Sequence, residues 1–140
     1  SEVYITEEEK DFLMVLSQIP FLPLVRFKLK CKSPKSEKTE LAPVYIRDVN
    51  ESSEEMENTG QTLISLKNRG LITLDYDKPL KNGDYSVFKN SEIYSQFCSN
   101  MDNDLSDCVP ALEYGIIALT PFGIDVLESL DILDVSNNDI

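Results

Sequence analysis

The chain has 140 residues, 41% of them hydrophobic, which is enough to bury one core of ordinary size, so we expect a single domain. Its 25 acidic residues against 13 basic ones give a net charge of −12, which argues against a general affinity for nucleic acid or anionic lipid, since that affinity depends on neutralising phosphates. The chain contains no histidine and no nucleophile or phosphate-binding motif, so we expect no enzyme and no cofactor or metal site.

Two features bear on the compartment. The longest apolar run, from Ile19 to Val25, is interrupted by two prolines and is too short to cross a bilayer, and the chain opens without a basic and then apolar leader. The cysteines are odd in number and lack a C-x-x-C spacing, so we expect free, half-buried thiols at Cys31, Cys98 and Cys108, the alternative being a redox pair of Cys98 and Cys108. These features predict a cytoplasmic protein that does not associate with membranes.

The first helix is predicted from its capping pattern. Thr6 and Glu9 form a capping box, and Pro20 should end the helix. Apolar side chains at helical spacing predict a buried face made of Phe12, Leu13 and Leu16. We expect the opposite, solvated face to carry Glu7, Glu8, Glu9 and Asp11.

A basic strand follows. Residue types alternate from Val25 to Lys32, so an extended strand places Val25, Phe27, Leu29 and Cys31 on one face and Arg26, Lys28, Lys30 and Lys32 on the other. With a returning strand at Pro43 to Ile46, residues 24–48 are expected to form a hairpin. The basic face is either a lysine-protected edge strand, a phosphate-contacting surface, or a docking face for the acidic C-terminal third of the same subunit or of a partner subunit.

The next helix is predicted over residues 62–69, ending at Gly70 and passing into the apolar residues Leu71 to Leu74. The segment before it, residues 51–58, holds four carboxylates and offers only Met56 as an apolar anchor. Any helix over residues 51–58 should therefore be short or loosely packed.

Residues 71–119 are expected to form a sheet. We predict one strand over residues 71–76, a second over residues 85–88 that continues through 93–97, and a third over residues 114–119, with a tight turn at Asn82-Gly83-Asp84. The polar stretch from Ser99 to Pro110 is expected to lie outside the sheet. It contains Asp102, Asp104 and Asp107, but it lacks the glycine and glutamate of an EF-hand loop, so we interpret it as a solvated acidic loop.

A last helix is predicted over residues 121–131. Thr120 is a good N-cap and Pro121 suits the first helical position. The expected apolar face consists of Phe122, Val126, Leu127 and Leu130. Residues 134–140 should form a flexible tail.

Two short motifs carry a family resemblance. Leu66 with Gly70-Leu71-Ile72, and Leu119-Thr120 with Gly123, are similar to two signatures of the winged helix-turn-helix regulators of the MarR-like and PadR-like kind. The first signature closes the recognition helix, and the second opens the helix after the wing. The resemblance covers about half the chain and implies an α+β fold of the winged helix-turn-helix kind. The hairpin inserted at residues 24–48 departs from the family pattern. We expect a winged helix with this inserted hairpin and an extended wing, forming one domain over residues 1–133.

The resemblance implies a DNA-binding transcriptional regulator. In such a regulator the exposed face of the recognition helix reads base edges and contacts phosphate. The nucleic-acid-binding residues would then be Gln61, Thr62, Ser65, Lys67, Asn68 and Arg69, with Lys78 and Lys81 of the wing adding backbone contacts. The family also implies a homodimer whose contacts would come from Val126, Leu127, Leu130 and Ile132.

The alternative is an acidic winged-helix module that binds a partner protein and not DNA. Four features favour it: the negative total charge, the poor second helix, the inserted hairpin and the long insertion before Gly115. Each degrades the docking geometry for a DNA groove while adding surface that faces protein.

Overall fold

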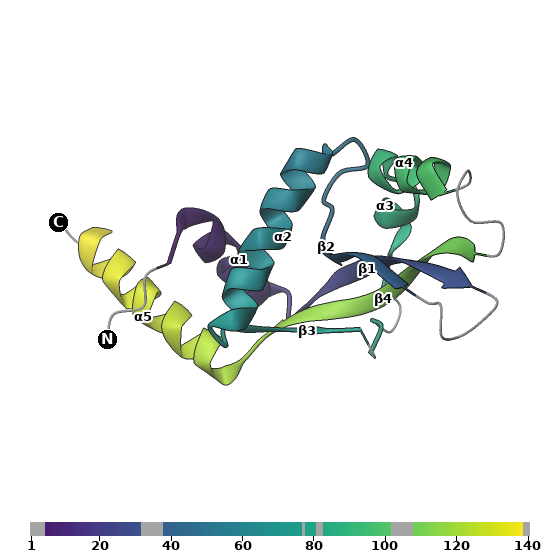
Figure 1. The fold of residues 1–140 in the computed structure, drawn as a ribbon. Coiled ribbons are helices and arrows are strands. Elements are labelled where there is room, and N and C mark those ends of the chain that lie inside the picture. Colours follow the sequence, from purple (N-terminus) through teal and green to yellow (C-terminus); the bar gives the residue numbers. More distant parts are fainter. Residues whose placement is uncertain (1–4, 32–37, 77, 81–82, 102–107, 139–140) are drawn as a thin grey trace.

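The computed structural model describes residues 5–31, 38–76, 78–80, 83–101 and 108–138, and it has an α+β architecture (Figure 1). Four strands form one antiparallel sheet in the order β2-β1-β4-β3. The elements in chain order are α1 (Glu7–Gln18), β1 (Phe21–Cys31), β2 (Lys38–Val44), α2 (Ser53–Asn68), β3 (Ile72–Asp75), α3 (Ser86–Lys89), α4 (Glu92–Met101), β4 (Cys108–Leu119) and α5 (Pro121–Asn138).

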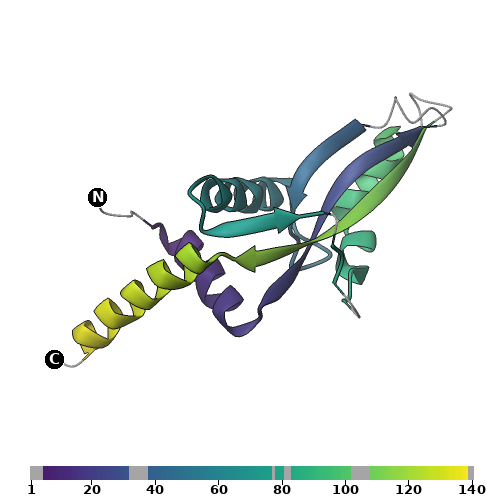
Figure 2. The same cartoon turned by 90° about the horizontal axis from the view of Figure 1, so that it is seen from below.

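The two central strands organise the molecule. β1 and β4 pair along their full length, from Phe21 opposite Ala118 to Cys31 opposite Cys108. The helices α1, α2 and α5 gather at one end of this pair, and α3 and α4 lie at the other (Figure 2). Two hydrophobic clusters result. The first contains Phe12, Leu13, Leu16, Leu22, Leu24, Leu63, Leu66, Leu71, Ile72, Ile117 and Leu127. The second contains Val25, Phe27, Val44, Ile46, Met56, Tyr85, Phe88 and Ile93.

The prediction for the first helix is confirmed. The backbone N–H of Glu9 donates to Thr6 Oγ1 at 3.2 Å, and that of Thr6 donates to Glu9 Oε1 at 3.1 Å, which completes the capping box. The predicted core residues Phe12, Leu13 and Leu16 are buried. Glu9 itself is also buried, so its assignment to the solvated face is wrong.

The inserted hairpin is confirmed, since β1 and β2 pair antiparallel, and the alternation along β1 holds through Leu29. The bounds of the returning strand, predicted over Pro43 to Ile46, are wrong, because β2 spans Lys38–Val44. The edge-strand interpretation is wrong, because β1 lies between β2 and β4 and its backbone is paired on both sides. Lys32 lies outside the described residues.

The prediction for residues 51–58 is wrong. These residues and the predicted recognition helix belong to one continuous 16-residue helix, α2, whose N-cap Ser52 accepts a hydrogen bond from Glu55 N–H at 3.1 Å. Met56 is buried, and α2 lies close over β2, where a Cβ added at Gly60 would stand 3.2 Å from the Pro43 carbonyl oxygen. The Ser52 cap and the buried Met56 side chain therefore stabilise helix in this segment, although its four carboxylates alone disfavour a well-packed helix.

The predicted strands are confirmed only in part. β3 and β4 pair from Ile72 opposite Leu119 to Asp75 opposite Ile116, as expected. The strand predicted over residues 85–88 and 93–97 is wrong, because these segments form α3 and α4, with Phe88 and Ile93 buried in the second cluster. Residues 108–110, predicted to lie outside the sheet, belong to β4. The turn residue Asn82 and the acidic residues Asp102, Asp104 and Asp107 lie outside the described residues.

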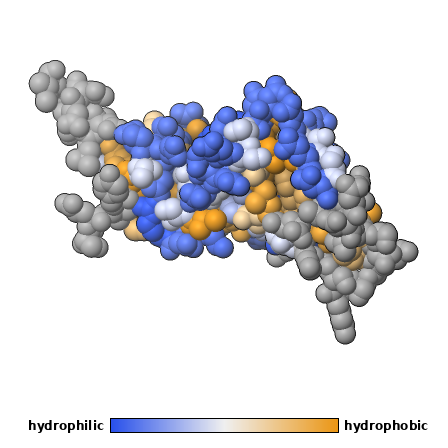
Figure 3. All heavy atoms as spheres, turned by 45° about the horizontal axis from the view of Figure 1, so that its top comes forward, coloured by the Kyte–Doolittle hydropathy of each residue, from blue (hydrophilic) through white to orange (hydrophobic). Residues whose placement is uncertain are grey.

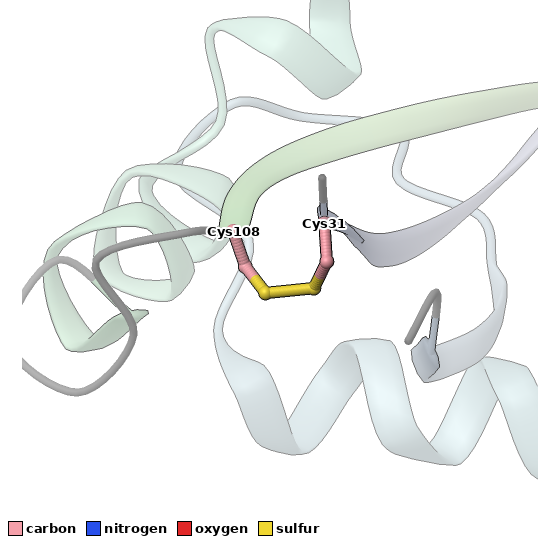
Figure 4. The surroundings of a disulfide bond; sticks show 2 residues. All are labelled: Cys31 and Cys108. Carbon is pink, nitrogen blue, oxygen red and sulfur yellow. A yellow bond between two sulfur atoms is a disulfide. The ribbon is translucent and has the colours of Figure 1, made fainter. Parts of the chain in front are cut away.

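A disulfide corrects the cysteine prediction. Cys31 and Cys108 are partners in the β1–β4 register, with 4.0 Å between their Cα atoms, and their sulfur atoms are bonded (Figure 4). Cys98 on α4 is a free thiol, as predicted. The pairing depends on the strand register, which the sequence spacing of the cysteines does not reveal.

The last helix begins as predicted, with Gly123 N–H donating to Thr120 Oγ1 at 2.9 Å. It continues to Asn138, past the predicted end at residue 131, and extends away from the sheet (Figure 2). Leu127 is buried and Val126 packs against the first cluster, whereas Phe122, which was also expected on the apolar face, is 47% exposed.

No helix in the described part of the chain is both long enough and apolar enough to cross a membrane.

The two sequence motifs meet at one place, which we call the junction. Thr120 N–H donates to the Leu71 carbonyl at 3.1 Å, and Thr120 Oγ1 donates to the Gly70 carbonyl. Gly70 has a φ of +76°, which ends α2, and a Cβ at Gly123 would collide with the Leu71 carbonyl oxygen. The motif residues thus fasten the end of α2 to the start of α5.

Candidate functional site

Three of the predicted DNA-contacting residues lie in a groove shared with acidic residues. Gln61, Thr62 and Ser65 on α2 line a hollow of about 590 Å³ together with the first turn of α1. That turn supplies Glu7, Glu8 and Glu9. Carboxylates beside these side chains oppose the approach of a phosphate backbone.

Two of these polar side chains form hydrogen bonds with the carboxylates. Thr62 Oγ1 donates to Glu8 Oε2 at 3.2 Å, and Ser65 Oγ donates to Glu9 Oε2 at 3.2 Å. Arg69 forms an ion pair with Glu9, whose side chain is 6% exposed. The guanidinium that was expected to contact phosphate therefore neutralises a buried carboxylate of α1.

The other predicted contacts are dispersed. Lys67 and Asn68 are exposed beside a different hollow, of about 270 Å³, whose wall includes Pro43 and Tyr76. Lys78 is exposed beyond β3, and Lys81 lies outside the described residues. Lys67 and Asn68 therefore line a different hollow from Gln61, Thr62 and Ser65.

The basic face of β1 is occupied by the acidic C-terminal third. Glu113 Oε2 on β4 lies 2.8 Å from the Arg26 guanidinium and 2.9 Å from Lys28 Nζ. Burial alone would raise the pKa of Glu113, but the hydrogen bonds and charges of these two cations outweigh it and lower the pKa. The Arg26 guanidinium also lies 4.5 Å from the ring centre of Tyr76, whose pKa burial raises to about 12. Of the three interpretations, docking of the acidic third is the one observed at Arg26 and Lys28.

A second acidic hollow lies between α1 and α2, and we call it the carboxylate cavity. It has a volume of about 490 Å³, and its walls come from α1, α2 and the loop between β2 and α2. The face over α2 is mostly hydrophilic (Figure 3). The lining residues are Glu8, Asp11, Phe12, Val15, Arg47, Glu51, Glu55, Asn58, Thr59 and Thr62.

Glu51 is the unusual member of this cavity. It is 9% exposed, its Oε1 accepts a hydrogen bond from Arg47 N–H at 3.3 Å, and its Oε2 has no partner among the described residues. Burial raises the pKa of the Glu51 carboxyl, and the backbone hydrogen bond and positive charge of Arg47 only partly offset this. Sequence reasoning missed Glu51 as a site residue, because its burial depends on the packing of the loop against the helices.

Arg47 lies against aromatic rings. Its guanidinium is 4.8 Å from the ring centre of Phe12 and 5.3 Å from that of Tyr45, and the two rings meet edge to face at 5.4 Å. Burial raises the pKa of Tyr45, so its ring stays neutral beside the cation. This arrangement is a cation–π contact at the cavity wall.

An apolar hollow lies on the other side of α1, and we call it the α1–α5 groove. It has a volume of about 490 Å³ and is lined by the end of α1, the start of β1, the end of β4 and α5. Its lining residues are Leu16, Ser17, Pro20, Phe21, Ala118, Leu119, Ile124, Leu127 and Glu128. Phe21 is 50% exposed and Ile124 is 45% exposed.

Comparisons with protein-family models, with curated proteins and with solved structures found no match to this chain.

In the described part of the chain, no three cysteine, aspartate or glutamate side chains come close enough together to hold a metal ion.

Proposed function

We propose that this protein is an interaction module that binds a partner protein in the α1–α5 groove. The observation that carries the proposal is the convergence of exposed apolar side chains on a hollow. Phe21 and Ile124 line it, and Ile19, which is 49% exposed, lies next to the lining residue Pro20. Single exposed apolar residues are ordinary on a protein surface, but a group around a groove favours recognition.

Charge favours one kind of partner. Residues 90–140 contain ten carboxylates and no lysine or arginine, and Glu128 lines the groove. A second copy of the chain would bring its own charge of −12 to this surface, so the homodimer implied by the resemblance is the weaker occupant. A basic amphipathic helix satisfies both the apolar floor and the acidic surroundings.

We infer that the architecture is a variant of the winged helix, in which α2, the β3–β4 pair and α5 take the places of recognition helix, wing and following helix. The junction of Gly70 and Thr120 supports this inference, since both belong to the motifs of the resemblance. The cytoplasmic location stays a prediction. The Cys31–Cys108 disulfide weighs against it, because such bonds persist mainly in oxidising compartments.

The test is titration of the full chain into two labelled synthetic helical peptides, followed by fluorescence anisotropy. One peptide is built from leucine and lysine, and in the other glutamate replaces lysine. We expect saturable binding of the lysine peptide alone. Equal binding of both peptides would contradict the basic partner, and binding of neither would contradict the function.

Two matched variants locate the binding surface. Ile124 lies in the groove, and Ile64, which is 41% exposed, lies on α2 outside it. Ile124→Ser should raise the Kd for the lysine peptide about tenfold, because burying an isoleucine contributes about 1.5 to 3 kcal/mol. Ile64→Ser should change it less than about twofold. Equal effects would move the site out of the groove, and a stable dimer in sedimentation would replace the partner with a second copy.

The second candidate function is a DNA-binding transcriptional regulator. One observation favours it: Lys67 and Asn68, two of the polar residues that the resemblance assigns to the recognition helix, are exposed near the end of α2. Anisotropy of a labelled mixed-sequence duplex, measured at rising salt with the parent chain and with Lys67→Ala, tests it. Binding that weakens with salt and with the substitution supports DNA recognition, and no binding at about 10 µM protein contradicts it.

A further inference from the structure

We propose that the carboxylate cavity binds an extended organic cation, one that carries ammonium groups on an alkyl chain. The cavity shares no lining residue with the α1–α5 groove, so this site is independent of the proposed protein-binding surface. Its volume of about 490 Å³ lies in the range of small-ligand sites, about 300 to 1,000 Å³.

The charge of the cavity wall is the first step. Four carboxylates and one guanidinium line the cavity. The carboxylates belong to Glu8, Asp11, Glu51 and Glu55, and among the described residues none of them forms an ion pair. Within the described ranges, Glu8 accepts a side-chain hydrogen bond from the Thr62 hydroxyl and Glu55 accepts one from the Ser52 hydroxyl. Uncompensated carboxylates that converge on a hollow attract a cation.

The buried carboxyl is the second step, and it is independent of the surface charge. Glu51 is 9% exposed and leaves Oε2 without a hydrogen-bond partner in the described part of the chain. Buried polar atoms are almost always paired, because an unpaired one costs about 1 to 3 kcal/mol. Glu51 lines the cavity, so a rotation of its side chain would bring Oε2 to an ammonium group bound there and supply the missing partner.

Arg47 shows how a cation is held on this wall. Its guanidinium already lies on the rings of Phe12 and Tyr45, and it forms no ion pair among the described residues. The aromatic wall therefore accepts positive charge and alkyl surface together. Since Arg47 covers these rings, a ligand is directed toward the carboxylates.

The spacing of the carboxylates selects the kind of cation. No three acidic side chains among the described residues are close enough to share one metal ion. A ligand with ammonium groups along a flexible stem can reach separated carboxylates, which a single ion cannot. The chemistry fits a free polyamine or the lysine side chains of a protein segment.

The test is isothermal titration of the full chain at fixed ionic strength. The probes are spermidine and a terminally blocked Lys-Gly-Lys peptide, with a norleucine peptide and magnesium chloride as controls. We expect saturable binding of at least one ammonium probe and none of the controls. Tighter binding of spermidine identifies a free polyamine, and tighter binding of the peptide identifies protein side chains.

Three substitutions, each removing one negative charge, complete the design. Glu51→Gln should raise the Kd of the bound probe about tenfold, and the exposed Asp11→Asn about threefold. Glu57→Gln, on α2 but outside the cavity wall, should raise it less than about 1.5-fold. Thermal unfolding confirms that each variant is folded.

Three results would overturn the proposal. The first is no saturable binding of either ammonium probe up to about 10 mM. The second is binding of the norleucine peptide or magnesium as tight as that of the ammonium probes. The third is a loss for Glu57→Gln equal to that for Glu51→Gln, which would reduce the effect to the net charge of the chain.

Discussion

The junction lies at the C-terminal end of α2 and the carboxylate cavity lies along its N-terminal part, and the two places differ in how well their polar groups are hydrogen-bonded. At the junction, the hydroxyl and backbone N–H of Thr120 each find a carbonyl, and Gly123 leaves no room for another atom. In the cavity, Glu51 is buried, and one of its oxygens has no hydrogen-bond partner in the part of the chain that the structure describes. Polar residues that stabilise a fold have their hydrogen bonds satisfied, as Thr120 does. A buried polar atom that lacks a hydrogen bond among the described residues, as in Glu51, indicates a residue kept for a function other than stability.

The largest expected effect is at the junction. Gly123→Ala should lower the free energy of unfolding by about 3 kcal/mol, because the new Cβ collides with the Leu71 carbonyl oxygen. Gly70→Ala is the matched control, since nothing lies within 4 Å of its Cβ and only its φ of +76° opposes the change. It should cost about 1 to 2 kcal/mol. Urea unfolding measures both, and equal losses would show that close packing at Gly123 is unimportant.

The hydroxyl of the junction comes next. Thr120→Val keeps the shape of the side chain but removes the hydrogen bond that caps α5 and the hydrogen bond to the Gly70 carbonyl. The free energy of unfolding should therefore fall by about 1 to 2 kcal/mol. Ser17→Ala removes an exposed hydroxyl that donates only to Met14 within α1, and it should change stability by less than about 0.5 kcal/mol. A comparable loss in both variants, measured by thermal unfolding, would contradict the special role of the junction.

Glu113 contrasts with Glu51, because its carboxylate is ion-paired with Arg26 and Lys28. The folded pKa of Glu113 lies below its ordinary value of 4.5, so its stabilising contribution is present above that value and is lost as the pH falls through the folded pKa. Glu113→Gln should therefore cost about 1 kcal/mol at pH 7, since the pair is partly exposed. Urea unfolding from pH 2 to 7 should show the parent and the variant converging at the acid end. A constant difference would rule out the charge as the cause.

The smallest effect has the opposite sign. The folded pKa of Glu51 is raised above 4.5, so the folded state favours the protonated carboxyl and loses stability as the pH rises through the folded pKa. Arg47, Glu55 and Asp48 are the charged neighbours that modulate this titration. Glu51→Gln should gain about 0.5 kcal/mol at pH 7 and less at pH 4. A loss of stability at pH 7 would show that the carboxylate is needed by the fold itself.

Sequence predicts the local features of this fold and misses those that depend on distant contacts. Three features can be predicted because the residues involved lie within a few positions of one another in the chain. They are the capping box of α1, the alternation along β1 and the Thr120 cap of α5. The short apolar run around Phe88 is compatible with a strand or with a helix. The helix α3 forms because it packs the Phe88 side chain into the second hydrophobic cluster.

The candidate sites were less accessible to prediction. The placement of the predicted recognition residues depends on α1, whose carboxylates bond to Thr62 and Ser65 from more than fifty positions away in the chain. Glu51 gives no local signal, since its loop contains neither a motif nor an apolar period. The α1–α5 groove is equally hidden, because it forms only where both ends of the domain meet.

The bond between Cys31 and Cys108 closes a covalent ring that contains β2, α2, β3, α3 and α4. A protease that cuts one peptide bond within this ring leaves the two products joined through sulfur. The nicked chain should therefore migrate as a single band without reductant and as two bands with it. One cut inside the ring need not release either arm, so the N-terminal and C-terminal segments that form the α1–α5 groove stay tethered to each other after nicking.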